Sequence, residues 1–235
     1  MKKVVKFGGS SLASAEQFRK VGDIIHADES RRYVIPSAPG KRFGKDIKVT
    51  DMLYECYGLA EKGEDFSEAL AKIKARYQEI IDGLNLELSL EEEFQKIARE
   101  FQNKAGKDYA ASRGEYLNGI IMANYLGYDF IDPAEDAIYF AKDGSFDGEK
   151  TNKALAKKLL KSERAVIPGF YGAMPDGTVK TFSRGGSDVT GSIVAKAVRA
   201  DLYENWTDVS GFLITDPRII PNPEGIETIT YRELR

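Results

Sequence analysis

Two stretches of this chain combine adjacent glycines with a basic residue, and this combination is suited to binding anions. Lys6 precedes Gly8-Gly9-Ser10, and Arg184 precedes Gly185-Gly186-Ser187-Asp188. Glycines let phosphate oxygens approach the main-chain N–H groups, and the start of a helix adds the positive end of its dipole. A guanidinium can hold a carboxylate or a phosphate through two parallel hydrogen bonds. Together the two stretches predict a phosphate chain that is held from both sides.

Neither stretch is specific when it is taken alone. Lys6-Phe7-Gly8-Gly9 matches neither the P-loop pattern nor the Gly-x-Gly-x-x-Gly pattern of dinucleotide-binding folds. A glycine-rich connector in which Ser187 or Asp188 merely caps the next helix would have the same sequence. The anion-binding interpretation therefore depends on what else lies nearby.

Three further polar residues have both a structural and a functional interpretation. Ser37 ends a predicted strand, Thr50 starts a predicted helix, and Glu115 lies in Ser112-Arg113-Gly114-Glu115, which is expected to open another helix. Turn formation, capping and a favourable helix dipole would each account for these residue types. From local sequence the choice between capping and ligand binding stays open.

Strands alternate with helices along most of the chain. The pattern predicts strands at 4–7, 32–37, 128–132, 137–141, 164–168, 178–182, 201–206 and 226–230. This alternation indicates an α/β fold with a mainly parallel sheet covered on both faces, in which ligands lie at the carboxyl ends of the strands. Five candidate residues fall at or just past such ends: Lys6, Ser37, Phe170, Arg184 and Asp208.

The segment from about 67 to 107 differs from this alternation. It carries two amphipathic helical patterns, with apolar residues such as Ile73 and Tyr77 in the first and Phe94 and Ile97 in the second. We expect an all-helical insertion within a single domain that covers residues 1–235.

Composition excludes several classes of protein. The 235 residues include 34 basic and 37 acidic ones, giving a net charge of −3 that argues against a nucleic-acid partner. No apolar run is long enough for a signal peptide or a membrane span, so we expect a cytoplasmic protein that does not bind membranes. The single cysteine, Cys56, excludes an intrachain disulfide and is expected to be a buried small apolar residue.

Five motifs, taken together and in order, resemble the catalytic domain of aspartate kinases (aspartokinases), which belong to the amino acid kinase family. The resemblance covers essentially the whole chain. The motifs are Lys6-Phe7-Gly8-Gly9-Ser10-Ser11, Ser112-Arg113-Gly114-Glu115, Gly169-Phe170, Ser183-Arg184-Gly185-Gly186-Ser187-Asp188, and Thr207-Asp208-Val209-Ser210-Gly211 through Thr215-Asp216-Pro217-Arg218.

The resemblance implies a three-layer α/β fold and ATP-dependent phosphorylation of the β-carboxylate of L-aspartate, the first step towards lysine, threonine and methionine. Lys6 and Asp188 would be catalytic. The nucleotide would contact Lys6, Gly8, Gly9, Ser10, Thr207, Asp208, Asp216 and Arg218. The aspartate would contact Ser37, Thr50, Glu115, Phe170, Arg184, Ser187 and Asp188. Mg²⁺ would accompany ATP, and no dedicated all-protein metal site is expected.

The resemblance also bears on the extent of the chain and on its departures from the family. Aspartokinases continue beyond the position of Arg235 into two regulatory ACT domains, so we expect a catalytic-domain fragment of an enzyme that is a homo-oligomer at full length. Leu213-Ile214 stand where many members have Tyr-Thr, and the segment between Ser37 and Thr50 is longer here.

Two alternatives are kept beside this reading. The first is another amino acid kinase, such as glutamate 5-kinase or acetylglutamate kinase, against which the helical insertion, Glu115 and the Arg-Gly-Gly-Ser-Asp block argue. The second is a non-catalytic, ligand-sensing kinase-like module, against which the joint presence of Lys6, Arg184 and Asp188 argues.

Overall fold

The computed structural model describes residues 1–135, 137–183, 185–207, 211, 213–216 and 219–230. Its centre is a parallel sheet with the strand order β3-β4-β2-β1-β7. The strands are β1 (Lys3–Phe7), β2 (Arg31–Pro36), β3 (Asp129–Phe130), β4 (Ala165–Val166) and β7 (Leu202–Trp206). β1 pairs with β2 on one side and with β7 on the other, so the strand that carries Lys6 is an interior one.

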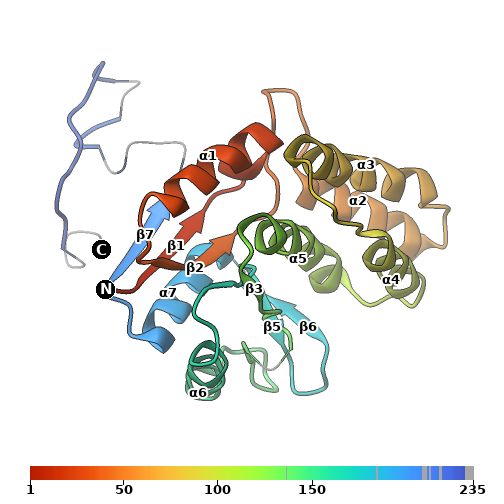
Figure 1. Cartoon of the computed structure of the whole chain (residues 1–235). Helices are drawn as coiled ribbons and strands as arrows, with labels where there is room; N and C mark the ends of the chain where they lie inside the picture. Colours follow the sequence, from red (N-terminus) through yellow and green to blue (C-terminus); the bar gives the residue numbers. More distant parts are fainter. Residues whose placement is uncertain (136, 184, 208–210, 212, 217–218, 231–235) are drawn as a thin grey trace.

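Helices cover both faces of this sheet (Figure 1). On one face lie α1 (Ala15–His26) and α5 (Lys107–Leu126), and on the other lie α6 (Gly148–Leu159) and α7 (Gly186–Val198). A small antiparallel hairpin of β5 (Tyr171–Ala173) and β6 (Val179–Thr181) contacts α5. The expected α/β fold with helices on both sides of a mainly parallel sheet is confirmed.

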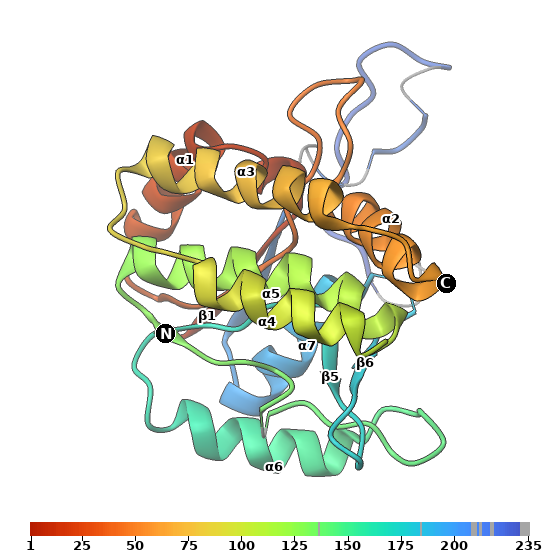
Figure 2. The ribbon, with the colours of Figure 1, turned by 90° about the vertical axis from the view of Figure 1, so that its right-hand side faces the viewer.

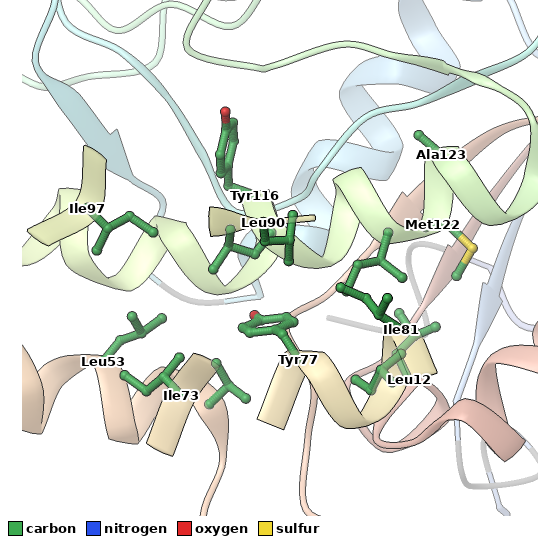
Figure 3. Packing of buried hydrophobic residues seen from close by; sticks show 14 of the residues in the cluster. Leu12, Leu53, Ile73, Tyr77, Ile81, Leu90, Ile97, Tyr116, Met122 and Ala123 are labelled. Carbon is green, nitrogen blue, oxygen red and sulfur yellow. The ribbon is translucent and has the colours of Figure 1, made fainter. Parts of the chain in front are cut away.

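Three more helices pack outside α5 on the first face, as Figure 2 shows. They are α2 (Val49–Lys62), α3 (Ser67–Leu84) and α4 (Glu91–Gln102). The last two are the helices expected between residues 67 and 107; that they are an insertion stays a prediction. Figure 3 shows their core, in which Tyr77 and Ile81 of α3 lie beneath α5. Burying each large apolar side chain contributes about 1.5–3 kcal/mol.

The alternation of side chains along β1 decides where its lysine points. Val5 and Phe7 belong to the core beneath α1 and α5, whereas Val4 belongs to the core beneath α6 and α7. Because successive residues of a strand face opposite sides of the sheet, Lys6 shares the face of Val4. The Lys6 side chain is therefore directed toward α7.

The structure corrects four local predictions. Helix α5 begins at Lys107, so Ser112–Glu115 lie inside it rather than at its start. Lys48 is the N-cap of α2 and Thr50 lies within the helix. Gly185, with φ of 56°, is the N-cap of α7, so neither Ser187 nor Asp188 caps it. The runs 137–141 and 226–230 form only isolated bridges or no strand at all.

Candidate active site

A cleft of about 580 Å³ lies at the carboxyl ends of β1, β2 and β7. The turn after β1, the segment after β2 and the residue after β7 all reach its wall, and α2 and α5 contribute one residue each. Seven residues that the sequence singled out line it: Gly8, Gly9, Ser10, Ser37, Thr50, Glu115 and Thr207. The parallel topology thus brings together residues that are distant in the chain, as expected of such a sheet.

Lys6 and Asp188 form an ion pair beside this cleft. Lys6 Nζ lies 2.8 Å from Asp188 Oδ1, and Lys6 is only 8% exposed. Asp188 reaches this position because α7 starts at Gly186 and places it in the first turn, on the face of the sheet toward which Lys6 points. A cation held in this way beside a glycine turn is positioned to neutralise an anion that enters the cleft.

The turn after β1 is packed tightly against the segment after β2. The Gly40 N–H donates a hydrogen bond of 2.8 Å to the Gly9 carbonyl. A Cβ atom at Gly40 would come within 2.6 Å of the Gly9 carbonyl carbon, and one at Gly9 would come within 2.8 Å of the Ala38 carbonyl oxygen. Both positions therefore require glycine, and the turn expected to bind phosphate rests on a second glycine turn.

Glu115 places a buried carboxyl group in the wall of the cleft. Its side chain is 7% exposed, and Oε2 has no hydrogen-bond partner within the described part of the chain. Burial raises the pKa of Glu115 to about 8, against the opposing effect of a hydrogen bond from the Ala38 backbone. A buried carboxylate without a cation costs free energy, so this position favours a ligand that brings a positive charge.

Helix α5 is fixed around Glu115 by two buried hydrogen bonds. Tyr77 on α3 donates to the Gly114 carbonyl at 2.7 Å, and Asn118 donates from Nδ2 to the Ser37 carbonyl at 2.7 Å. Gly114 also lets α5 approach the strand end closely, because a Cβ there would lie 2.8 Å from that of Ala38. These contacts hold Glu115 and Ser37 at a fixed spacing.

Phe170 and Ser187 lie together beside the start of α7 and not in the wall of this cleft. The Phe170 N–H donates to Thr190 Oγ1 at 3.0 Å, and its φ of 85° is unusual for a residue with a side chain. A Cβ at Gly169 would meet the Ser187 side chain at 2.5 Å, so glycine is needed there. The two predicted aspartate contacts thus adjoin Asp188, which joins them to Lys6.

Four further residues predicted to contact ligands are not among the described residues that line the cleft or lie beside the start of α7. Arg184, Asp208 and Arg218 lie outside the described residues. Asp216 is described, but its carbonyl accepts the N–H groups of Ile219 and Ile220 in a turn, and it does not line the cleft. The nucleotide contacts predicted from the last motif therefore stay predictions.

Two basic residues of the cleft were not among the candidates. Lys41 and Lys48 line it from the segment between β2 and α2. The sequence carries a signal for them, because this segment is longer than in many family members and contains four basic residues.

Comparisons with known proteins place these features in a family. The sequence model described as "Amino acid kinase family" matches residues 1–235. The chain belongs to the amino acid kinase family. It is 37% identical to aspartokinase 3 of Bacillus subtilis over 99% of this chain and 54% of that protein. Aspartokinase 1 of Arabidopsis thaliana, a chloroplastic protein, is 30% identical over 98% of this chain and 44% of its own length.

Solved structures agree with this membership of the amino acid kinase family. The aspartate kinase of Clostridium acetobutylicum matches with a TM-score of 0.96 and 54% identity, over 100% of this chain and 54% of that one. Aspartokinase III of Escherichia coli, in complex with aspartate and ADP, matches with a TM-score of 0.80 and 25% identity, over 96% and 53%. The chain spans about half the length of these relatives.

The described residues of this family member contain neither a membrane-spanning helix nor a cluster of metal-binding side chains. None of its helices there has the length and apolarity that crossing a membrane requires. Within the same residues, no three His, Cys, Asp or Glu side chains gather as they would around a metal ion.

Proposed function

We propose that this chain catalyses the transfer of the γ-phosphoryl group of ATP to the β-carboxylate of L-aspartate, which yields 4-phospho-L-aspartate. The observation that carries the proposal is the 54% identity, over the entire chain, to a solved aspartate kinase. The compared proteins named above are all aspartokinases, so the comparisons favour neither a glutamate or acetylglutamate kinase nor a non-catalytic module.

The cleft offers a charge that is complementary to the ammonium end of an amino acid substrate. The unpartnered carboxyl group of Glu115 is suited to the α-ammonium group, and Ser37 and Thr50 bring hydroxyl groups to the same cleft. Arg184 would hold a carboxylate of the aspartate, as the resemblance implies. A substrate without a positive charge would leave the buried Glu115 protonated at neutral pH and would gain no ion pair from it.

The residues beside Lys6 fit the phosphates of a nucleotide. The Gly8-Gly9-Ser10 turn lines the cleft, and the pair of Gly9 and Gly40 keeps side chains away from the main chain there. Lys6 would neutralise charge on the transferring phosphoryl group, and Mg²⁺ bound together with ATP would supply further positive charge to the phosphates. The acceptor is already an ionised carboxylate, so the protein needs no general base and contributes alignment and electrostatic stabilisation.

A substrate panel tests this proposal. ADP release would be measured with ATP, Mg²⁺ and, in turn, L-aspartate, L-glutamate and N-acetyl-L-glutamate. We expect turnover only with aspartate. Turnover with either glutamate compound instead, or ATP hydrolysis that does not depend on any amino acid, would contradict it. A place in lysine biosynthesis, a homo-oligomeric full-length enzyme and a cytoplasmic location stay predictions of the resemblance.

A further inference from the structure

The segment between β2 and α2 forms a closed loop of nine residues, 40–48, at the rim of the cleft. The Val49 N–H donates to the Pro39 carbonyl at 3.2 Å, which brings the two ends of the loop together. Within the loop the Asp46 N–H donates to the Phe43 carbonyl at 3.0 Å. Compact loops whose ends meet and whose own side chains pack inside them are frequently functional.

Two charged residues of the loop stabilise its conformation by pairing with each other. Arg42 binds both oxygens of Asp46, from Nε at 2.8 Å and from Nη2 at 3.0 Å, and its Nη1 reaches Glu79 on α3 at 2.7 Å. The Arg42 guanidinium holds the pKa of Asp46 far below its usual range. Arg42 and Asp46 therefore neutralise each other, and they attach the loop to α3.

Arg76 on α3 makes the second attachment from beneath the loop. Its guanidinium is only 4% exposed, donates from Nη2 to the Gly40 carbonyl at 3.1 Å, and lies 3.5 Å from Asp46. A buried arginine is costly unless its hydrogen bonds and its charge are used. Arg76 holds the residue that starts the loop, and this residue is the one that packs against Gly9.

Two lysines of the loop that line the cleft form no ion pair with a carboxylate in the part of the chain that the structure describes. Lys41 and Lys48 line the cleft, and neither ammonium group has an ion-pair partner within the described residues. Lys41 follows Gly40 directly, and a Cβ at Gly40 would lie 2.8 Å from the Ser10 backbone nitrogen. The Lys41 side chain is therefore attached to the loop next to its contact with the Gly8-Gly9-Ser10 turn.

We propose that the loop 40–48 is a second phosphate-binding wall, in which Lys41 and Lys48 contact the phosphates of the nucleotide and Arg76 is the positioning residue that holds the loop in place. The inference rests on the proposed function, because it deepens the same site. It gives a role to two α3 contacts, those of Arg76 and Glu79, that the reaction chemistry alone does not use. Glu115 is the acidic residue suited to the α-ammonium group of the substrate, which Lys41 and Lys48 would repel. The two lysines are therefore suited to the anionic nucleotide.

Calorimetric titration of ATP, adenosine and L-aspartate into matched variants tests this wall. Lys41→Gln and Lys48→Gln each remove one cation, and Lys45→Gln is the control, because Lys45 is an exposed lysine of the same loop that does not line the cleft. We expect each cleft variant to bind ATP about tenfold more weakly than the control. Adenosine and aspartate should bind all three variants equally well.

Arg76 is tested by comparing Arg76→Gln with Arg76→Lys. A positioning role predicts that Arg76→Gln weakens ATP binding at least as much as Lys41→Gln or Lys48→Gln does, at an unchanged adenosine affinity. Arg76→Lys should restore part of the lost ATP affinity. If Arg76→Gln only destabilised the fold, the melting temperature would fall and the binding of ATP, adenosine and aspartate would weaken together.

Three results would overturn the inference. If Lys41→Gln and Lys48→Gln bind ATP as tightly as Lys45→Gln does, the two lysines do not contact the phosphates. A selective loss of aspartate affinity would assign the lysines to the other substrate. A uniform loss of all ligands in Arg76→Gln would make its role merely structural. Turnover by the unaltered chain distinguishes failure of this inference from failure of the proposed function. If turnover depends on aspartate but the lysine variants bind ATP normally, only the second phosphate-binding wall is disproved. If the unaltered chain has no turnover, the proposed function itself is disproved.

Discussion

Lys6 and Glu115 are two buried charges of opposite sign that the cleft keeps apart. Lys6 is paired with Asp188 at 2.8 Å, whereas Glu115 has an oxygen with no partner inside the described protein. An anion that binds at Lys6 would therefore share this cation with Asp188, whereas Glu115 is suited to a cation. This asymmetry gives each residue a separate test.

Aspartate binding should depend on pH through Glu115. Its pKa of about 8 means that the carboxyl group is protonated at neutral pH in the free protein, and binding of the α-ammonium group requires the carboxylate. Aspartate affinity should thus rise about tenfold per unit up to about pH 8 and level off above it. Calorimetric titrations between about pH 6 and pH 9 measure this. Glu115→Gln is the control, and a slope that persists in it would exclude Glu115 as the cause.

The same carboxyl group should make folding stability fall with pH. The folded protein keeps this proton from about pH 4.5 to about pH 8, a range in which the unfolded chain has lost it. The free energy of unfolding should therefore decrease across this range, by about 1.4 kcal/mol per unit of pKa difference at most. Urea unfolding of Glu115→Gln should lack this component. Equal pH dependence in both proteins would show that Glu115 titrates normally.

Removing Lys6 should affect the chemical step more than substrate binding. Lys6→Ala should lower kcat by at least about 100-fold with little change in the aspartate KM, because the lost charge acts mainly on the transferring phosphoryl group. Steady-state kinetics measure both constants. Lys20→Ala, on the exposed side of α1, should behave like the unaltered chain. A near-normal kcat of Lys6→Ala would show that Lys6 is not a catalytic residue.

At the scale of elements, two glycine turns hold the floor of the cleft. Gly40→Ala would drive a methyl group into the backbone of Gly9 and Ser10, and neither can move like a flexible side chain. We expect it to cost about 1–3 kcal/mol of stability and to weaken ATP binding. Gly44→Ala in the same loop is the control, because its methyl group would meet nothing within 4 Å. Thermal melting of both variants measures the difference, and equal melting temperatures would show that the turns can separate without cost.

Helix α5 shows where sequence reasoning fails at this scale. Most of its 20 residues are buried, so it has no alternation of apolar and polar faces from which its extent can be read. The sequence therefore predicts its start at Ser112 instead of Lys107. Gly114, inside the motif that was expected to open the helix, allows the close approach of α5 to Ala38. The amphipathic helices α3 and α4 were predictable because each has a buried and an exposed face.

At the scale of the whole molecule, the alternation of strands and helices was sufficient to predict the layers and the edge at which the candidates gather. It could not predict that Lys6 and Asp188 meet, because this depends on which face of β1 is covered by α7. The roles of Arg76 and Tyr77 were equally out of reach. Both residues act on backbone carbonyls that are more than 30 positions away, and no sequence spacing encodes such a contact.

Identification of the reaction product is the most direct test of whether this cleft transfers a phosphoryl group to the β-carboxylate of aspartate. The chain would be incubated with ATP, Mg²⁺, L-aspartate and hydroxylamine, which converts an acyl phosphate to a hydroxamate, and the product would be identified by mass spectrometry against α- and β-hydroxamate standards. We predict aspartate β-hydroxamate in an amount equal to the ADP released. Formation of the α-isomer, or release of ADP without any hydroxamate, would contradict the account.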